Sequence, residues 1–109
     1  MTAHAQRYLD YCHNRRKPQL IIDTDPGQDD AAAILMALGL EKMGLLEVWA
    51  LTTVAGNVSL HNTNKNACVI ADWAGRSDLG VYGGAEKPLI KTLITAQHVH
   101  GHNGLGGMQ

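Results

Sequence analysis

The stretch of residues 20–33, LIIDTDPGQDDAAA, constrains the fold of this chain more than any other. It begins with three apolar residues, which are typical of a short buried strand, and it ends in an alanine-rich run, which is typical of a helix. Pro26 and Gly27 lie between these two parts and favour a turn. The stretch therefore predicts a strand, a turn and a helix in succession, which is the basic unit of an α/β fold.

The same stretch carries four aspartates within eight residues: Asp23, Asp25, Asp29 and Asp30. Two unit charges about 4 Å apart repel by about 4 kcal/mol at an effective dielectric near 20. Such crowding is tolerated if the carboxylates stay solvated, take up protons or bind a cation. Oxygen ligands without thiolates suit a hard cation, Ca²⁺ or Mg²⁺, and open α/β sheets bind ligands where their strands end. We therefore predict a metal site on this turn.

A simpler interpretation accounts for two of the four aspartates. Acidic residues at the start of a helix cap it or interact favourably with its dipole, which would explain Asp29 and Asp30. It does not explain Asp23 and Asp25, because these precede the turn.

The composition limits the class of protein. With 109 residues, 45% hydrophobic and 17% charged, the chain is expected to form at most one globular domain. A net charge of −1 gives no electrostatic reason to expect a nucleic-acid partner, and we interpret the basic run 15–17 as solvated. The chain has no apolar run of the roughly 18 residues typical of a membrane span, no secretory signal, and no motif around Cys12 or Cys68. We therefore expect a cytoplasmic protein without a membrane partner.

The segments on either side of the aspartate turn complete the first half of the predicted fold. Residues 1–18 form a polar lead-in, in which apolar residues at helical spacing predict a short amphipathic helix. The helix after the turn is apolar around much of its girth, so we expect it to be well buried. One of its faces is formed by Ala32, Leu35, Met36, Gly39 and Met43, with Ile34 and Leu38 elsewhere.

The remaining segments predict two more strands and a second long helix. Residues 45–54 form a continuous β-rich run, typical of a central parallel strand covered on both faces. Ser59 is a suitable N-cap for a helix that ends near Gly75, and residues 80–83 predict a third strand. Alternating strands and helices predict a parallel sheet with right-handed crossovers.

This topology brings distant residues together. Asp25, Asn57 and the segment after Tyr82 each follow a predicted strand. Because the carboxyl ends of parallel strands lie at one edge of the sheet, we expect these residues to line a single site there.

Three motifs along the chain resemble those of a known family. They are DTDPGQDDAAAI at residues 23–34, LTTVAGNV at 51–58, and VHG at 99–101 followed by GLGG at 104–107. In this order they resemble the nucleoside hydrolases, the inosine-uridine-preferring nucleoside N-ribohydrolases. The resemblance implies a Rossmann-like parallel sheet with flanking helices, and it identifies residues 19–109 as the N-terminal part of a truncated nucleoside hydrolase domain.

The resemblance also implies a reaction. Members of this family hydrolyse the N-glycosidic bond of ribonucleosides to base and ribose, which passes through an oxocarbenium-like sugar and uses a water activated by Ca²⁺. Asp25 and Asp30 would ligate the Ca²⁺, and Asp25 would also act as the general base. Asp23 would support the site without binding the metal.

Three further residues would contact the substrate by the same resemblance. Asp29 and Asn57 would bind the ribose, and His100 would assist the binding or departure of the nucleobase. Asn57 also has a simpler interpretation as a turn residue, because it follows Gly56.

Two other histidines flank His100. In an extended segment His98, His100 and His102 would share one face, where they could bind adventitious zinc or nickel. A solvated surface position is the more ordinary interpretation of each. His102 also stands where the family usually has an acidic residue, so the charge of this loop departs from the family pattern.

The length is the larger departure. Members of the family are roughly three times as long as this chain, well within the ordinary range of enzyme sizes. The part without a counterpart here would hold further metal ligands, including an aspartate and a backbone carbonyl, ribose-binding Asn and Glu residues, and a second leaving-group histidine. We therefore expect an incomplete site, with a ribonucleoside as the partner, and a homo-oligomer for a full-length protein.

Two other functions are compatible with parts of the sequence. Asp23-Thr24-Asp25 has the D-x-D form of an aspartate-dependent phosphatase, although that reaction gives no role to Asn57 or His100. Alternatively, the chain is a non-catalytic fragment that binds a metal or a partner, with apolar faces that a three-stranded sheet leaves uncovered.

Overall fold

The computed structural model describes residues 2–14 and 17–107 of the chain. In chain order its elements are α1 (Ala3–Asn14), β1 (Gln19–Thr24), α2 (Gln28–Lys42), β2 (Glu47–Thr53), α3 (Leu60–Trp73), β3 (Gly80–Gly83) and α4 (Gln97–His100). The predicted succession of strands and helices is confirmed. None of the helices within the described ranges combines the length and hydrophobicity needed to cross a bilayer. Arg15 and Arg16 of the basic run lie outside the described residues.

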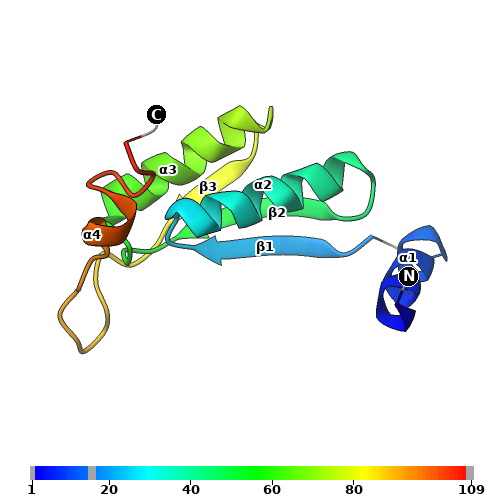
Figure 1. The fold of residues 1–109 in the computed structure, drawn as a ribbon, viewed down its shortest axis with the longest axis horizontal. Helices are drawn as coiled ribbons and strands as arrows, with labels where there is room; N and C mark the ends of the chain where they lie inside the picture. The colour runs from blue at the N-terminus through cyan, green and yellow to red at the C-terminus, as the bar shows by residue number, and fades with distance from the viewer. Residues whose placement is uncertain (1, 15–16, 108–109) are drawn as a thin grey trace.

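The three strands form one parallel sheet in the order β1-β2-β3. Figure 1 shows α2 and α3 together on one face of this sheet, with α1 set apart at the far end of β1. The register pairs Thr24 with Thr53 and Thr53 with Gly83, so the carboxyl ends of the three strands are level. The predicted fold class, an α/β parallel sheet with flanking helices, is confirmed.

The hydrophobic core lies between the sheet and these two helices. Ile34 of α2, Leu51 of β2 and Ile70 of α3 are each at most 1% exposed. Leu105, from the C-terminal glycine-rich loop, is buried in the same cluster. Burying one side chain of this size contributes about 1.5–3 kcal/mol, so these contacts hold the helices and the loop against the sheet.

Helix α2 is buried along one stripe and not around most of its girth. The stripe consists of Ala31, Ile34 and Leu38, whereas Met36 and Met43 are 69% and 72% exposed. The prediction of a well-buried helix was therefore wrong for the chain as the structure describes it. The reason is that the sheet and α3 contact α2 from one side.

The sheet is likewise covered on one face, in contrast to the prediction for residues 45–54. Ile21, Trp49 and Tyr82 lie on the face opposite the helices, and their exposed fractions are 64%, 57% and 63%. We call this face the open face of the sheet, because none of the described elements covers it. The continuous apolar run of β2 is typical of a strand in a fully covered sheet, yet the elements present here cover only half of it.

Helix α3 begins as predicted. The Ser59 hydroxyl accepts a hydrogen bond from the Asn62 backbone N–H at 3.4 Å. At the other end Ala74 is the cap residue, and Gly75 follows it with a φ of +77°. This left-handed conformation lets the chain turn towards β3 without the strain that a Cβ would cause.

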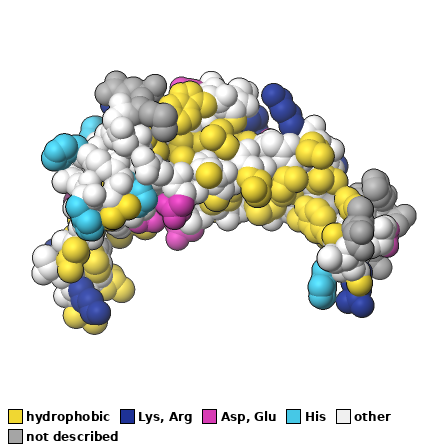
Figure 2. Space-filling view, viewed as in Figure 1, with side chains coloured by type: hydrophobic (Ala, Val, Ile, Leu, Met, Phe, Trp, Pro, Cys, Tyr) yellow, Lys and Arg dark blue, Asp and Glu magenta, His cyan; other side chains and the backbone are white. Residues whose placement is uncertain are grey.

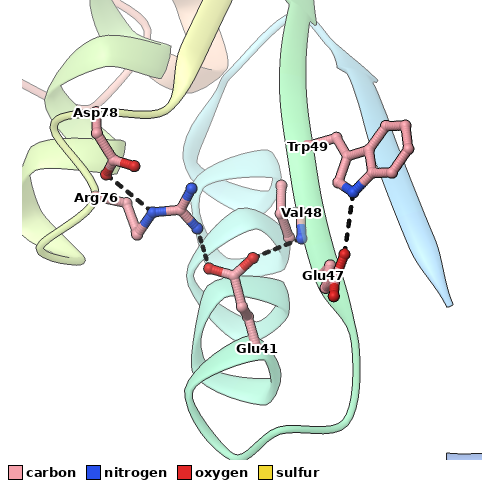
Figure 3. A network of polar contacts seen from close by, with 6 residues as sticks. All are labelled: Glu41, Glu47, Val48, Trp49, Arg76 and Asp78. Atoms are coloured by element: carbon pink, nitrogen blue, oxygen red, sulfur yellow. Dashed lines mark hydrogen bonds and ion pairs between the residues drawn. The ribbon is translucent and has the colours of Figure 1, made fainter. Parts of the chain in front are cut away.

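A polar network joins the ends of elements that lie far from the carboxyl edge of the sheet (Figure 3). Glu41 of α2 accepts the Val48 N–H of β2 at 2.6 Å and forms an ion pair with Arg76. Arg76 also donates to Asp78 at 3.0 Å. Its bonds to Asp78 and then Glu41 raise the pKa of Arg76, and the bond to Arg76 lowers the pKa of Asp78. The network therefore ties the α3–β3 connection to α2 and β2.

Candidate functional site

The residues expected at one edge of the sheet do meet there. Asp25 directly follows β1, and Asn57 follows β2. The Asn57 backbone N–H donates to Asp25 Oδ2 at 2.8 Å, and the Asn57 side-chain Nδ2 donates to the Asp25 carbonyl oxygen at 2.8 Å. Asn57 thus holds both the main chain and the carboxylate of Asp25.

The segment after β3 reaches the same edge. The Gly84 N–H donates to the Thr53 carbonyl at 2.7 Å, and the Ala55 N–H donates to the Ala85 carbonyl at 3.0 Å. Residues 86–93 then form a protruding loop with a hollow of its own, whose lining includes none of the four aspartates. This loop is visible at the lower left of Figure 1. Leu89 and Ile90 of this loop are fully solvated, at about their maximal exposure.

Two glycines allow the site side chains to approach one another. A Cβ on Gly56 would overlap the Asp25 carboxylate and lie 2.8 Å from its Cγ. A Cβ on Gly27 would lie 2.8 Å from the His100 ring and 2.9 Å from Asn57 Nδ2. Neither position has room for a side chain. The sequence indicated a turn at each of these glycines, but it could not indicate this role, because the role depends on contacts between distant segments.

Asp30 lies in the first turn of α2 and faces Asp25. Its Oδ2 accepts the Gly27 N–H at 3.4 Å, so the simpler capping interpretation describes a real contact. Burial raises the pKa of Asp30, the bond from Gly27 opposes this, and the charges of Asp25 and Asp29 raise the pKa further. Asp25 is also within hydrogen-bonding reach of Asp30. The two aspartates proposed as ligands are therefore neighbours.

This pair fits a hard cation in ligand type but not in ligand number. Ca²⁺ takes six to eight oxygen ligands, and a carboxylate pair supplies up to four. Within residues 2–11 and 17–107, whose side chains the structure describes, no group of three or more His, Cys, Asp or Glu side chains is arranged to hold a metal ion. Asp29 is exposed at the same turn, where it can reach a ligand in solution. Additional oxygens would have to come from water, the main chain or another polypeptide segment.

Asp23 occupies a different position from the other three aspartates. Its Oδ1 accepts a hydrogen bond from the Thr52 hydroxyl at 2.7 Å, across the β1–β2 pair. The side chain is exposed and lies on the open face of the sheet. Its predicted supporting role stays a prediction, and the bond to Thr52 gives it a fixed place.

His100 reaches the site from α4, more than 70 residues away in sequence. Its Nδ1 accepts the backbone N–H of Gln28, the first residue of α2, at 3.2 Å. When the ring is neutral its proton is therefore on Nε2, which can donate to a ligand. His100 therefore lies beside the aspartate turn, and its role toward the nucleobase stays a prediction.

The three alternating histidines do not share a face. Gln97–His100 is helical, so His98 and His100 point in different directions. His98 and His102 are exposed, and the His102 carbonyl accepts from Asn62 Nδ2 at 3.2 Å. The extended arrangement considered for adventitious metal binding was therefore wrong.

Comparison with known proteins identifies the family of this chain. The sequence profile described as "Inosine-uridine preferring nucleoside hydrolase" matches residues 20–109. The chain belongs to the nucleoside hydrolase family. The prediction made from the three motifs is thus confirmed.

Several known proteins, two of them named as nucleoside hydrolases, are similar to this chain over the same region. An uncharacterised protein of Schizosaccharomyces pombe is 52% identical over 89 residues, covering 82% of this chain and 28% of that protein. The inosine-uridine preferring nucleoside hydrolase of Crithidia fasciculata is 44% identical over 81% of this chain and 27% of its own length. The pyrimidine-specific ribonucleoside hydrolase RihA of Shewanella woodyi is 49% identical with the same coverage.

A solved structure confirms the fold of this nucleoside hydrolase region. A plant nucleoside hydrolase superposes with a TM-score of 0.74 at 44% identity, covering 84% of this chain and 28% of that one. The chain therefore spans a little over a quarter of the length of the relatives that it matches.

Proposed function

We propose that this chain carries the cation- and ribose-facing part of a nucleoside hydrolase, which cleaves ribonucleosides to base and ribose. The observation that supports it is the meeting of Asp25, Asn57 and His100 around Gly27 and Gly56, at the sheet edge where α/β enzymes bind ligands. The names of the Crithidia and Shewanella relatives, which refer to inosine, uridine and pyrimidine ribonucleosides, support the substrate class.

In the proposed reaction each residue acts from the position described. A bound Ca²⁺ would acidify and orient the attacking water. Asp25, held by Asn57 through its Oδ2, would bind the cation together with Asp30 and accept the water's proton. Asp29, exposed at the same turn, would accept hydrogen bonds from the ribose hydroxyls, with Asn57 alongside. His100 would donate from Nε2 to the departing base.

A second candidate function concerns the 109-residue chain by itself. Two carboxylates supply up to four oxygen ligands, fewer than the six to eight that Ca²⁺ takes. In addition, Ile21, Trp49 and Tyr82 are exposed on the open face of the sheet. Both observations favour a non-catalytic fragment that binds a cation weakly or binds a partner. This candidate predicts no release of ribose by the isolated chain, even with excess Ca²⁺.

One experiment separates these functions from the phosphatase alternative. The chain is assayed alone, and also fused to the portion of the Crithidia hydrolase that follows its matched region, with inosine, uridine and a phosphomonoester as substrates. We expect base release by the fusion and not by the chain alone. An Asp25→Asn fusion controls for contaminating hydrolase. Phosphate release without base release would refute the hydrolase function.

The cellular location and the oligomeric state of the full-length enzyme are also proposals. We infer that the full-length enzyme is cytoplasmic and that, following the family resemblance, it is a homo-oligomer. Size-exclusion chromatography of the fusion and fractionation of cells expressing it would test both statements.

A further inference from the structure

Asn66 is a buried polar residue for which the proposed reaction has no role. It lies in the middle of α3 beside Ala67 and Ile70, and 4% of its surface is exposed. Burying an amide in an apolar layer is costly unless its hydrogen-bonding groups find partners. The contacts of its side chain therefore indicate why an asparagine stands there.

The Asn66 amide bonds two segments that are distant in sequence. Its Nδ2 donates to the Pro26 carbonyl at 3.1 Å and to the Asn103 carbonyl at 2.5 Å. Pro26 directly follows Asp25, and Asn103 comes three residues after His100. Because both partners are carbonyl oxygens, only the NH₂ end of the amide can face them. One side chain thus connects the aspartate turn to the histidine loop.

The loop is shaped to fit against this amide. Gly104 has a φ of +88°, and a Cβ there would lie 2.8 Å from Asn66 Nδ2 and 3.2 Å from the Pro26 carbonyl oxygen. The next residue, Leu105, is 1% exposed in the core. The loop therefore packs directly on Asn66 and the turn.

We propose that Asn66 is a positioning residue that sets the distance between the two halves of the site. It would fix the turn of Asp25 and Asp30 relative to His100, and so keep the His100 ring on the Gln28 N–H. This inference rests on the proposed function for its catalytic meaning. The structural claim, that the Asn66 hydrogen bonds hold the His100 ring on the Gln28 N–H, can be tested separately.

The first test uses the unmodified 109-residue chain in solution NMR. Two hydrogen bonds to carbonyls should slow exchange of the Asn66 side-chain amide protons by roughly fivefold or more relative to exposed Gln97, since one net hydrogen bond supplies about that factor. Scalar couplings across the hydrogen bonds should connect Asn66 Nδ2 to the carbonyl carbons of Pro26 and Asn103. Exchange as fast as that of Gln97, without these couplings, would overturn the inference.

The second test uses Asn66→Asp, which keeps the shape and replaces both N–H donors with acceptors. At alkaline pH we expect the ¹⁵N shifts of the His100 ring to change from a single Nε2–H tautomer to an average of two. The Gln28 amide proton should move to the position of a solvated amide. Circular dichroism should show that the helices are retained. A variant with an unchanged His100 tautomer would refute the positioning role.

Asn64→Asp is the matched control on the same helix. Asn64 uses Oδ1 to accept the Thr53 hydroxyl at 3.0 Å, and an aspartate retains that acceptor, so the His100 signals should stay as in the unmodified chain. If Asn66→Asp does not fold, the exchange and coupling measurements on the unmodified chain decide. None of these readouts involves turnover, so failure of the hydrolase proposal and failure of this inference are distinguishable.

Discussion

At the scale of single residues, the site depends on two glycines. Gly56 and Gly27 have no side chain, and this absence lets Asp25, Asn57 and His100 come within contact distance. The convergence of these three residues could be predicted from the strand order and the three motifs. The role of the glycines could not, because it appears only once residues about 30 and 70 positions apart are in contact.

Replacing Gly56 with alanine tests this dependence. The new Cβ should displace the Asp25 carboxylate and break its bond to the Asn57 N–H, so Ca²⁺ binding measured by calorimetry should weaken. Gly39→Ala is the control, because a Cβ at Gly39 meets nothing within 4 Å. That variant should gain about 1 kcal/mol in free energy of unfolding and bind Ca²⁺ unchanged. Equal Ca²⁺ binding by both variants would contradict the packing described.

Asp25 and Asp29 should respond differently to removal of their charge. In the fusion enzyme, Asp25→Asn removes a proton acceptor and one cation ligand, so kcat should fall by at least the roughly 10²–10⁴-fold expected for a lost general base. Asp29→Asn should mainly raise KM. It should also reduce the ratio of kcat/KM for a ribonucleoside to kcat/KM for its 2′-deoxy analogue. Near-normal turnover by Asp25→Asn with Ca²⁺ bound would show that the proposed mechanism is wrong.

At the scale of elements, the order and type of α1 to β3 followed from the sequence, whereas the short helix α4 and the buried face of α2 did not. The cap at Ser59 and the strands around Leu51 have local signals in turn chemistry and β-branched residues. Helix α2 is apolar on several sides, so its own sequence does not say which stripe packs. The choice of Ala31, Ile34 and Leu38 depends on where α3 and the sheet lie.

The network of Glu41, Arg76 and Asp78 predicts that part of the free energy of unfolding is lost at acid pH. Because Arg76 lowers the pKa of Asp78 in the folded state, the ionised carboxylate contributes stability above its unfolded pKa of about 3.9. That contribution is lost as the pH falls through the lower, folded pKa. Asp78→Asn should therefore be less stable than the unmodified chain at neutral pH.

Urea denaturation followed by circular dichroism would measure this difference. The two unfolding free energies should approach one another as the pH drops below about 4. Because the Asp78 carboxylate is exposed, the effect should also shrink at high salt. A stability difference that stayed constant across this pH range would rule out the ion pair as its cause.

At the scale of the whole molecule, the described chain is a sheet with helices on one side. Figure 2 shows apolar side chains along much of the visible surface, including the part over α2. The continuous apolar run of β2 predicted a sheet covered on both faces, and a local pattern cannot reveal that the described elements cover only one of them. The prediction of an incomplete site came from the family's length, which is a property of the whole domain.

The open face should make the isolated chain associate. Ile21 is 64% exposed in the middle of β1, so Ile21→Lys should reduce self-association in sedimentation velocity without lowering the free energy of unfolding by more than about 0.5 kcal/mol. Leu89→Lys, in the protruding loop, is the matched control for added charge and should have a smaller effect. Unchanged association of Ile21→Lys would show that this face is not responsible.

The hydrogen bonds made by the N–H groups at the start of α2 affect whether the site accepts phosphorylated substrates. A helix start ordinarily offers its free N–H groups to phosphate, but here Asp30 takes the Gly27 N–H and His100 takes the Gln28 N–H. A phosphate that used these two N–H groups would have to displace protein acceptors and approach three carboxylates. The fusion enzyme should therefore hydrolyse inosine and leave inosine 5′-monophosphate intact, and the monophosphate should compete poorly when added in excess. In the proposed enzyme, the loop that would donate a proton to the base would thus also disfavour phosphorylated substrates, so nucleotides would be spared without any residue dedicated to rejecting them.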